Sequence, residues 1–325
     1  MITILITGSS GQIGSDLIPA LVRKYGKSSV IASDITFSDR DYNVEKIRLD
    51  VTKKEDIETV IKEKSVTDVF HLGAILSASA EKHPYEAFFV NGNGTLNVME
   101  AAVKYSVDRI IIPSSIAVFG NDIAKEKVKP MDSTRPTTMY GITKVLSELL
   151  AQYYTSRYGI SVRGMRFPGI ISYETPPMAG TTDYAVDMFI HAVNHEKYKC
   201  YLKPDTPLPM MYFPDAIDAL VKIFEAEERS LRYRMEYNVS AFTFTPSELY
   251  SLIKEYYPDF SVEYEPDYRQ NIAESWPHSL DYSDAVKDWG YSPRFSLNDT
   301  VKDMIVNLER IRKENDMKKT LTQNP

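Results

Sequence analysis

The chain has 325 residues, of which 43% are hydrophobic and 26% are charged, with a formal net charge of −7. This composition is ordinary for a globular protein, and the length allows one large domain or a large and a small one. The negative charge argues against nucleic acid as the main partner, because phosphate binding requires a basic face. No run of about 18 apolar residues occurs, so we expect no membrane span.

We expect neither a signal peptide nor a disulfide. The chain enters an apolar segment directly at its N-terminus, which leaves no room for a signal sequence ahead of it. Cys200 is the only cysteine, and no Cys-His signature surrounds it, so we interpret it as a buried or tolerated thiol rather than a nucleophile. These features are typical of a cytoplasmic protein.

The first predicted strand, residues 3–7, leads into a turn with three glycines, where a predicted helix begins. Without side chains, the backbone N–H groups of such a turn can approach a pyrophosphate, and the positive end of the helix faces it. Asp34 ends the next apolar stretch, where its carboxylate can accept hydrogen bonds from ribose hydroxyls and would repel a 2′-phosphate. The pattern predicts an NAD site, with a structural turn as the alternative. The cofactor contacts expected from this region are Gly8, Ser10, Gly11, Gln12, Ile13, Gly14 and Asp34.

Apolar strand-like runs alternate with helical patterns up to about residue 170. The predicted strands cover residues 3–7, 30–33, 46–49, 68–72, 109–114 and 161–167. The predicted helices cover residues 13–25, 54–64, 85–105 and 140–158. Alternation of this kind predicts parallel βαβ units with helices on both faces of the sheet, which is a Rossmann-type doubly wound α/β fold.

Prolines break the pattern after residue 170, and the remaining pieces predict a smaller mixed α/β lobe. Helices are expected at residues 183–195 and from Pro214 onward. We therefore interpret residues 1–170 as the NAD-binding Rossmann domain, rejoined by parts of 205–240. In this interpretation, residues 171–315 form mainly the substrate-binding lobe, and residues 316–325 form a polar, frayed tail.

Tyr140 and Lys144 lie four residues apart on a predicted helix, so they project from one face. A tyrosine with its usual pKa of about 10 is a poor base at neutral pH, but a lysine cation and an oxidised nicotinamide ring both favour the phenolate. Lowering a pKa by about 3 requires roughly 4 kcal/mol. Tyr140 could then accept a hydroxyl proton while hydride leaves the same carbon for NAD, with Lys144 orienting the ribose. The alternative is a solvated helix face, since Tyr-x-x-x-Lys pairs are common by chance.

Hydroxyl groups lie at the end of the predicted strand 109–114, at the sheet edge where open α/β folds bind ligands. Ser115 would hold the substrate oxygen, with Ser114 as the other candidate. The histidines at 191, 195 and 278 lack metal-ligand spacing with nearby carboxylates, so we predict no metal. His71 could titrate, although a structural role at the end of its strand is the simpler interpretation.

Five segments together resemble the extended short-chain dehydrogenases, a family that includes the sugar-nucleotide epimerases. They are the glycine turn with its Gly-x-x-Gly-x-x-Gly spacing, Asp50-Val51, Leu72-Gly-Ala74, the segment from Pro113 to Gly120, and Tyr140-x-x-x-Lys144. The resemblance implies that Ser115, five residues before the glycine, is the catalytic serine. It also implies cofactor contacts from Asp50, Val51, Leu72, Gly73, Ala74, Tyr140, Lys144 and Ile170.

Longer strings are similar, more narrowly, to the short-chain type of L-threonine 3-dehydrogenase. These strings are Gly73–Ala78, Gly169–Tyr173, Ala179–Ala185, Leu208–Tyr212, Phe242–Leu249 and Trp276-Pro277. The resemblance implies NAD-dependent oxidation of the 3-hydroxyl of L-threonine to 2-amino-3-oxobutanoate, on the route to glycine or aminoacetone. It makes Ser77, Thr182 and Trp276 candidate substrate contacts, whose structural alternatives are a turn residue, a helix N-cap and packing of the lobe.

Two other functions are compatible with the same fold. A nucleotide-sugar epimerase or dehydratase would use Tyr140 and Lys144, but the small lobe shows no basic cluster for a diphosphate, and Phe119 replaces the tyrosine usual in epimerases. A non-catalytic NAD sensor typically loses the tyrosine or the lysine. The predicted helices 85–105 and 140–158 carry apolar residues on more than one face, and family members pair such helices, so we expect a homodimer.

Overall fold

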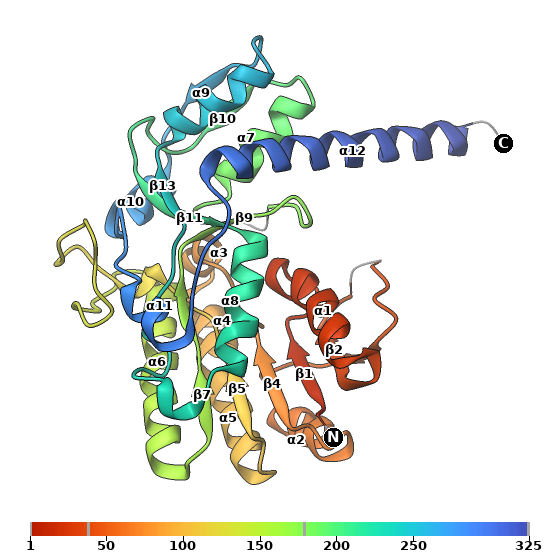
Figure 1. Cartoon of the computed structure of the whole chain (residues 1–325), viewed down its shortest axis with the longest axis vertical. Helices are drawn as coiled ribbons and strands as arrows, with labels where there is room; N and C mark the ends of the chain where they lie inside the picture. The colour runs from red at the N-terminus through yellow and green to blue at the C-terminus, as the bar shows by residue number, and fades with distance from the viewer. Residues whose placement is uncertain (1, 38–39, 178–179, 324–325) are drawn as a thin grey trace.

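The computed structural model describes residues 2–37, 40–177 and 180–323, with side chains described up to residue 317. Its central feature is a six-stranded sheet of strand order β3-β2-β1-β4-β5-β7, in which every neighbouring pair is parallel (Figure 1). The strands are β1 (Ile4–Thr7), β2 (Val30–Asp34), β3 (Glu45–Arg48), β4 (Asp68–His71), β5 (Arg109–Ile111) and β7 (Ser161–Arg163).

Helices cover both faces of this sheet, as the alternating pattern predicted. In β1, Ile4 and Ile6 pack into one layer and Leu5 packs into the other, because successive side chains of a strand point to opposite faces. The doubly wound α/β fold is therefore confirmed. The first layer contains α1 (Gln12–Tyr25) and α8 (Phe213–Glu225), and the second contains α2 (Lys54–Glu63), α5 (Gly94–Lys104) and α6 (Met139–Tyr158).

The two predicted strands at 109–114 and 161–167 are each interrupted. Pro113 has no N–H to donate, and a Cβ on Gly164 would lie 2.1 Å from the carbonyl oxygen of Ile112, so the two chains approach closely there. Beyond these positions the chain forms a second parallel sheet of strand order β12-β8-β6. The two serines of β6 therefore lie beyond the carboxyl end of β5, in this second sheet and not in the large one. Its strands are β6 (Ser114–Ser115), β8 (Met165–Phe167) and β12 (Tyr237–Asn238).

The predicted helix 85–105 is present but not uniform, because a π-helical turn (Phe88–Asn93) separates its short first part from α5. Turns of this kind are rare and frequently occur at functional sites. Here the turn places Asn91 beside the segment after β4, where its side chain accepts from Ile75 N at 2.7 Å and donates to Ile75 O at 3.0 Å. Asn91 therefore fixes the path of that segment. Two short helices, α3 (Ser77–Lys82) and α4 (Pro84–Ala87), lie between that segment and the π-helical turn.

The rest of the chain builds a smaller lobe around its own apolar core. One sheet has the order β13-β11-β9, in which β11 is parallel to β9 and antiparallel to β13, and β10 and β14 form a separate parallel pair. The lobe strands are β9 (Gly169–Ile171), β10 (Tyr198–Cys200), β11 (Leu208–Tyr212), β13 (Phe242–Phe244) and β14 (Val262–Tyr264). The lobe helices are α7 (Tyr184–Val193), α9 (Pro246–Tyr256), α10 (Tyr268–Ser275) and α12 (Leu297–Gln323). Helix α11 (Ser283–Trp289) packs instead in the layer that contains α1 and α8. Short 3-10 helices elsewhere in the chain cover Lys27–Ser29, Ile116–Val118 and Glu228–Ser230.

The path of the chain between the large-sheet domain and the smaller lobe is compatible with the domain boundaries expected from the sequence. Helix α8 follows β11 of the lobe directly and returns to the large sheet beside α1, so we keep, as a proposal, a domain of 1–170 with parts of 205–240 and a lobe of 171–315. Helix α12 projects from the molecule and continues to Gln323, so the tail from 316 is helical as far as it is described (Figure 1).

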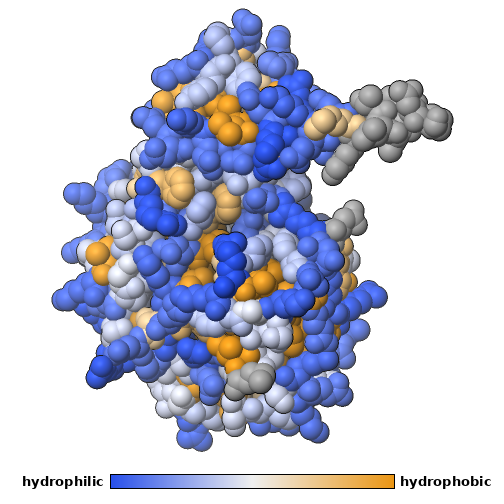
Figure 2. Space-filling view, turned by 45° about the vertical axis from the view of Figure 1, so that its right-hand side comes forward, coloured by the Kyte–Doolittle hydropathy of each residue, from blue (hydrophilic) through white to orange (hydrophobic). Residues whose placement is uncertain are grey.

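The surface shown in Figure 2 is mostly hydrophilic, with hydrophobic residues in separate small groups. Among the helices of the described ranges, none combines the length and the apolar character that are needed to cross a lipid bilayer.

Candidate active site

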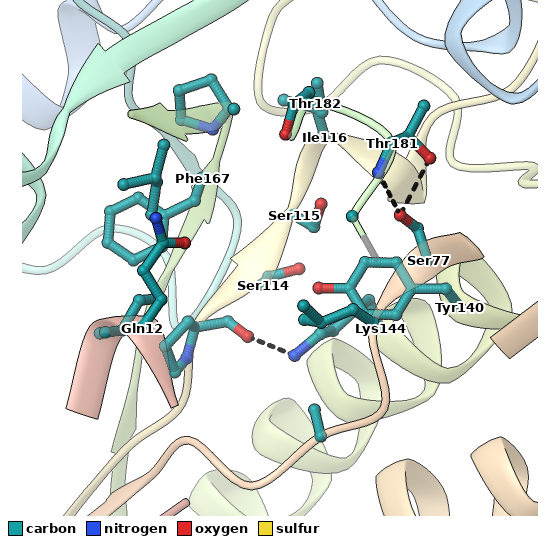
Figure 3. A pocket seen from close by; sticks show the side chains of 18 of the residues that line it. Gln12, Ser77, Ser114, Ser115, Ile116, Tyr140, Lys144, Phe167, Thr181 and Thr182 are labelled. Atoms are coloured by element: carbon teal, nitrogen blue, oxygen red, sulfur yellow. Dashed lines mark hydrogen bonds between the residues drawn. The ribbon is translucent and has the colours of Figure 1, made fainter. Parts of the chain in front are cut away.

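A pocket lies at the carboxyl ends of the parallel strands, where open α/β sheets bind ligands (Figure 3). The predicted site residues that line it are Gln12, Ile13, Leu72, Ala74, Ser77, Ser115, Tyr140, Lys144, Ile170, Thr182 and Trp276. The structure thus brings together the catalytic candidates, the substrate candidates and one end of the expected cofactor path. The predicted cofactor contacts that do not line this pocket are Gly8, Ser10, Gly11, Gly14, Asp34, Asp50, Val51 and Gly73.

The turn after β1 uses its glycines in two ways. Gly8 has a φ of +68°, which favours glycine, and a Cβ on it would lie 2.5 Å from Gly73 N. A Cβ on Gly14 would lie 2.6 Å from Gly8 O, so close packing requires both glycines. Gly11 differs, because among the described residues a Cβ there would meet Gly8 O alone, at 3.3 Å. The open side of Gly11 therefore leaves room for a phosphate beside the first turn of α1.

Two carboxylates lie along the expected nucleotide path. Asp34 ends β2 and accepts hydrogen bonds from Ser10 N at 2.9 Å and Ile35 N at 2.8 Å, which fix it beside the glycine turn. Burial raises the pKa of Asp50, but hydrogen bonds from Thr52 N and Oγ1, at 2.9 and 2.7 Å, outweigh burial and lower the pKa below its ordinary value. These groups suit hydrogen bonding to the ribose and adenine portions of a dinucleotide.

Helix α6 positions Tyr140 and Lys144 in its first two turns. Thr138 caps the helix by accepting from Gly141 N at 3.1 Å, so the helix starts at the edge of the pocket. Lys144 is buried, its Nζ lies 5.5 Å from the centre of the Tyr140 ring, and it donates to Pro113 O at 2.8 Å. Figure 3 shows both side chains at the pocket. The alternative of a solvated helix face is therefore excluded.

The protein groups around Tyr140 do not by themselves make it a base. Burial raises the pKa of Tyr140 to about 12, against the opposing effect of a hydrogen bond with Ser115. Burial also lowers the pKa of Lys144 to about 8, against the opposing charge of Glu148. In the protein alone, desolvation of Tyr140 therefore dominates its pKa, and the expected joint effect of Lys144 and an oxidised nicotinamide ring stays a prediction. Ionisation of Tyr140 near neutral pH therefore requires a further positive charge, such as that of an oxidised nicotinamide ring.

Ser114 and Ser115 both lie on β6, but their hydroxyls have different partners. Ser114 is buried, and its Oγ donates to Glu148 Oε1 at 2.6 Å. Ser115 Oγ accepts from Ala117 N at 3.2 Å and shares a hydrogen bond with Tyr140. Ser115 is therefore the serine beside the tyrosine, whereas the hydroxyl of Ser114 is engaged by Glu148.

The three predicted substrate contacts all reach the pocket, although each had a structural alternative. Ser77 Oγ lies 3.0 Å from Thr181 Oγ1 and accepts from Thr181 N at 3.2 Å, so Ser77 also holds the segment that precedes α7 (Figure 3). Thr182 does not cap α7, because the N-cap position belongs to Asp183. Trp276 is buried, and its Nε1 has no hydrogen-bond partner among the described residues.

Among the lining residues that were not predicted as site residues, Thr181 and Asp183 are the two with polar side chains. Both belong to a string that begins at Ala179, which itself lies outside the described residues. Asp183 Oδ2 accepts from Gly180 N at 2.8 Å, and its carboxylate is the single acidic group among the described lining residues. The signal was the run Gly-Thr-Thr-Asp, but spacing alone did not show which of its side chains would face the pocket.

Two side chains singled out from the sequence are not among the described residues that line the pocket. His71 is buried between two threonine hydroxyls, at 2.7 and 3.1 Å, and burial together with the charge of Lys144 lowers its pKa to about 3, so it stays neutral. Phe119 is buried, with its ring centre 4.9 Å from the Arg166 guanidinium. Within the described ranges, no three His, Cys, Asp or Glu side chains are grouped to hold a metal ion.

Comparison with known proteins places the chain in a family. Residues 4–251 match the model of the NAD dependent epimerase/dehydratase family. A relative from Staphylococcus aureus, described as an uncharacterized epimerase/dehydratase, is 40% identical over 311 residues, which cover 94% of this chain and 97% of the relative. The chain therefore belongs to the NAD dependent epimerase/dehydratase family.

Solved structures show a narrower likeness. A GalE-like L-threonine dehydrogenase from Cupriavidus necator, in its holo form, has a TM-score of 0.92 and 43% identity, covering 94% of this chain and 99% of that chain. A monomeric L-threonine 3-dehydrogenase from a metagenome database has a TM-score of 0.92 and 44% identity, covering 95% and 99%. The resemblance to this type of dehydrogenase is confirmed.

Proposed function

We propose that the protein is an NAD-dependent L-threonine 3-dehydrogenase, which oxidises the 3-hydroxyl of L-threonine to give 2-amino-3-oxobutanoate. The observation that carries the proposal is a single pocket lined by Tyr140, Lys144 and Ser115 together with the hydroxyls of Ser77 and Thr181. The two solved structures named above are L-threonine dehydrogenases, which supports this substrate over others of the family.

NAD is the cofactor in this proposal. The open side of Gly11 at the start of α1 suits a pyrophosphate, and Asp34 suits ribose hydroxyls. When bound, NAD would supply an oxidised nicotinamide that accepts hydride and carries a positive charge. The residues proposed to hold it are Gly8, Ser10, Gly11, Gln12, Ile13, Gly14, Asp34, Asp50, Val51, Leu72, Gly73, Ala74, Tyr140, Lys144 and Ile170.

Three side chains have separate roles in the proposed oxidation of the substrate. Tyr140, as the phenolate, accepts the proton of the 3-hydroxyl, so that the O–H electron pair becomes part of the new carbonyl bond. Ser115, next to Tyr140, holds the same oxygen and so orients the carbon that loses hydride. Lys144 is kept in place by its bond to Pro113 O, and its charge favours the phenolate.

L-threonine needs partners for both of its charged ends. Asp183 is the single carboxylate among the described lining residues and is our proposed partner for the ammonium group. The buried Nε1 of Trp276 lacks a partner among the described residues, and a buried donor left unpaired is costly. We assign it to the substrate carboxylate, with the hydroxyls of Ser77 and Thr182 nearby.

A nucleotide-sugar epimerase or dehydratase is the second candidate, because the Staphylococcus aureus relative carries that description. Its substrate would bring a diphosphate, whose charge calls for cations. Lys144 is the single basic residue among the described residues that line the pocket, and its Nζ is bonded to Pro113 O. A non-catalytic NAD sensor has less support, since both Tyr140 and Lys144 lie at the pocket.

The proposal is tested by incubating the purified protein with NAD and measuring NADH formation. L-Threonine, L-allo-threonine, L-serine and UDP-glucose are compared. We expect NADH with L-threonine, loss of that signal in Tyr140→Phe, and retention in Tyr158→Phe, a matched control on the exposed far end of α6. An epimerase returns the hydride to its substrate and forms no net NADH, so conversion of UDP-glucose is followed by chromatography of the sugar nucleotide. Conversion of UDP-glucose alone would favour the epimerase, and no turnover of any substrate despite NAD binding would favour the sensor.

We also propose a homodimer formed through the outer faces of α4 and α6. Large apolar side chains are exposed there, including Tyr85 at 75%, Leu149 at 57% and Tyr153 at 54%. Exposed apolar groups on neighbouring helices are typical of a surface that pairs with another chain. One similar L-threonine 3-dehydrogenase is described as monomeric, so light scattering of this protein is the deciding measurement.

A further inference from the structure

A buried ion pair that the proposed chemistry does not use lies directly beside β6. Glu148 of α6 accepts from Arg166 Nε at 2.8 Å and from Nη2 at 2.7 Å, and the two side chains are 5% and 2% exposed. The hydroxyl of Ser114 donates to the same carboxylate at 2.6 Å. The carboxylate is therefore held by a bidentate guanidinium and one hydroxyl.

The other edge of Arg166 is also occupied. Its Nη1 donates to Pro130 O at 2.6 Å, and its guanidinium lies 4.9 Å from the centre of the Phe119 ring. The cluster is thus saturated by protein groups, which makes it a poor ligand site. A buried ion pair adds little net stability compared with apolar residues of the same shape, so its placement is the informative property.

The placement connects the pair to the catalytic candidates. Tyr140, Lys144 and Glu148 follow at intervals of four residues and so share one face of α6. Lys144 is bonded to Pro113 O, and Glu148 is bonded to the hydroxyl of the next residue along the chain. Helix α6 and strand β6 are therefore fastened at two consecutive residues, immediately before Ser115.

We propose that Glu148, with Arg166 as its counter-ion, is a positioning residue of this active site, which holds Ser115 opposite Tyr140 and presents a negative charge to Lys144. The inference rests on the proposed function, because it assigns a task within that reaction. Among the ion pairs of the described residues, this is the one in which both side chains are almost fully buried.

The charges around Lys144 support this role. The titratable groups that face it are His71 from β4, which stays neutral, and Tyr140 and Glu148 from its own helix. Burial lowers the pKa of Lys144 to about 8, and Glu148 is the charge that opposes burial. Without Glu148, Lys144 would lose its proton at a lower pH.

The test variant removes both charges at once. Glu148→Gln alone would leave a buried, uncompensated guanidinium and endanger the fold, so the variant is E148Q/R166M. The matched control is D68N/R109M, which removes a pair with an N–O distance of 2.5 Å and a carboxylate side chain 1% exposed, at the amino ends of β4 and β5. This control lies at the end of the sheet opposite the pocket.

The first readout is the pH titration of Lys144, which is monitored by NMR of protein labelled with ¹³C at the lysine ε carbon. The Lys144 signal is assigned by its loss in Lys144→Met. We expect the midpoint to fall by about half a pH unit or more in E148Q/R166M and to stay unchanged in D68N/R109M. The second readout is kinetic. We expect kcat for L-threonine to fall about tenfold or more in E148Q/R166M, with KM for NAD little changed, because orientation and not cofactor binding is lost.

An unchanged Lys144 midpoint in folded E148Q/R166M would overturn the proposal, as would an equal loss of kcat in D68N/R109M. The titration requires no turnover. A wild-type protein that oxidises no threonine would therefore refute the proposed function, and the Lys144 midpoint would still decide the role of Glu148.

Discussion

The protonation of Tyr140 gives the most demanding prediction, because burial raises its pKa to about 12. At pH 8 such a group is ionised in about one molecule in ten thousand, which corresponds to roughly 5 kcal/mol against the phenolate. A unit positive charge about 4 Å away contributes roughly 4 kcal/mol at an effective dielectric constant of about 20. We therefore predict that NAD raises the ionisation constant of Tyr140 about a thousandfold.

The assay is NMR of protein labelled with ¹³C at the tyrosine ζ carbon, with the Tyr140 signal identified by its loss in Tyr140→Phe. The free protein, its NAD complex and its NADH complex are titrated in parallel, and NADH is the matched control because its nicotinamide ring is neutral. Because the phenolate is the active form, kcat/KM for L-threonine should rise with pH up to the midpoint measured with NAD. Identical midpoints in all three states would refute the reasoning.

Three further predictions concern the serines, the glycine turn and the exposed face. Ser115→Ala should lower kcat on the order of a hundredfold in the NADH assay, whereas Ser114→Ala should lower kcat less, and the reverse order would contradict our assignment. Gly14→Ala, with its Cβ 2.6 Å from a backbone oxygen, should lower the free energy of unfolding in urea by about 1–3 kcal/mol. Gly11→Ala should fold normally but raise the Kd for NAD about tenfold or more. Equal effects of Gly14→Ala and Gly11→Ala on stability and on the Kd would contradict the proposed phosphate site at Gly11. Leu149→Glu, at a position 57% exposed, should convert a dimer to a monomer in light scattering without changing the fold, and a monomeric wild-type protein would end that proposal.

Local sequence patterns were sufficient for most of the large sheet. The unbroken apolar run Ile4, Leu5 and Ile6 indicates a strand buried on both faces, and the following glycines mark the turn. The breaks at Pro113 and Gly164 were not foreseen, because the second depends on how closely two strands, distant in sequence, approach each other. Contacts of that kind are absent from any single stretch of sequence.

In the candidate site, too, local spacing was predictable from the sequence, whereas features that depend on the packed fold were not. The spacing of Tyr140 and Lys144 predicted a shared helix face, and both side chains lie at the pocket. The rise in the tyrosine pKa caused by burial was not foreseen, since burial is a property of the packed structure. Asp183 and Glu148 were missed for a related reason, because only the fold shows that one faces the pocket and the other lies beside β6.

The most direct test of the central claim follows the hydrogen on C3 of the substrate. The purified protein is incubated with NAD and L-threonine that carries deuterium at C3, and the NADH formed is analysed by mass spectrometry. The account predicts that each NADH contains one deuterium and that Tyr140→Phe forms none. NADH without deuterium, or no NADH in a protein that binds NAD, would contradict it.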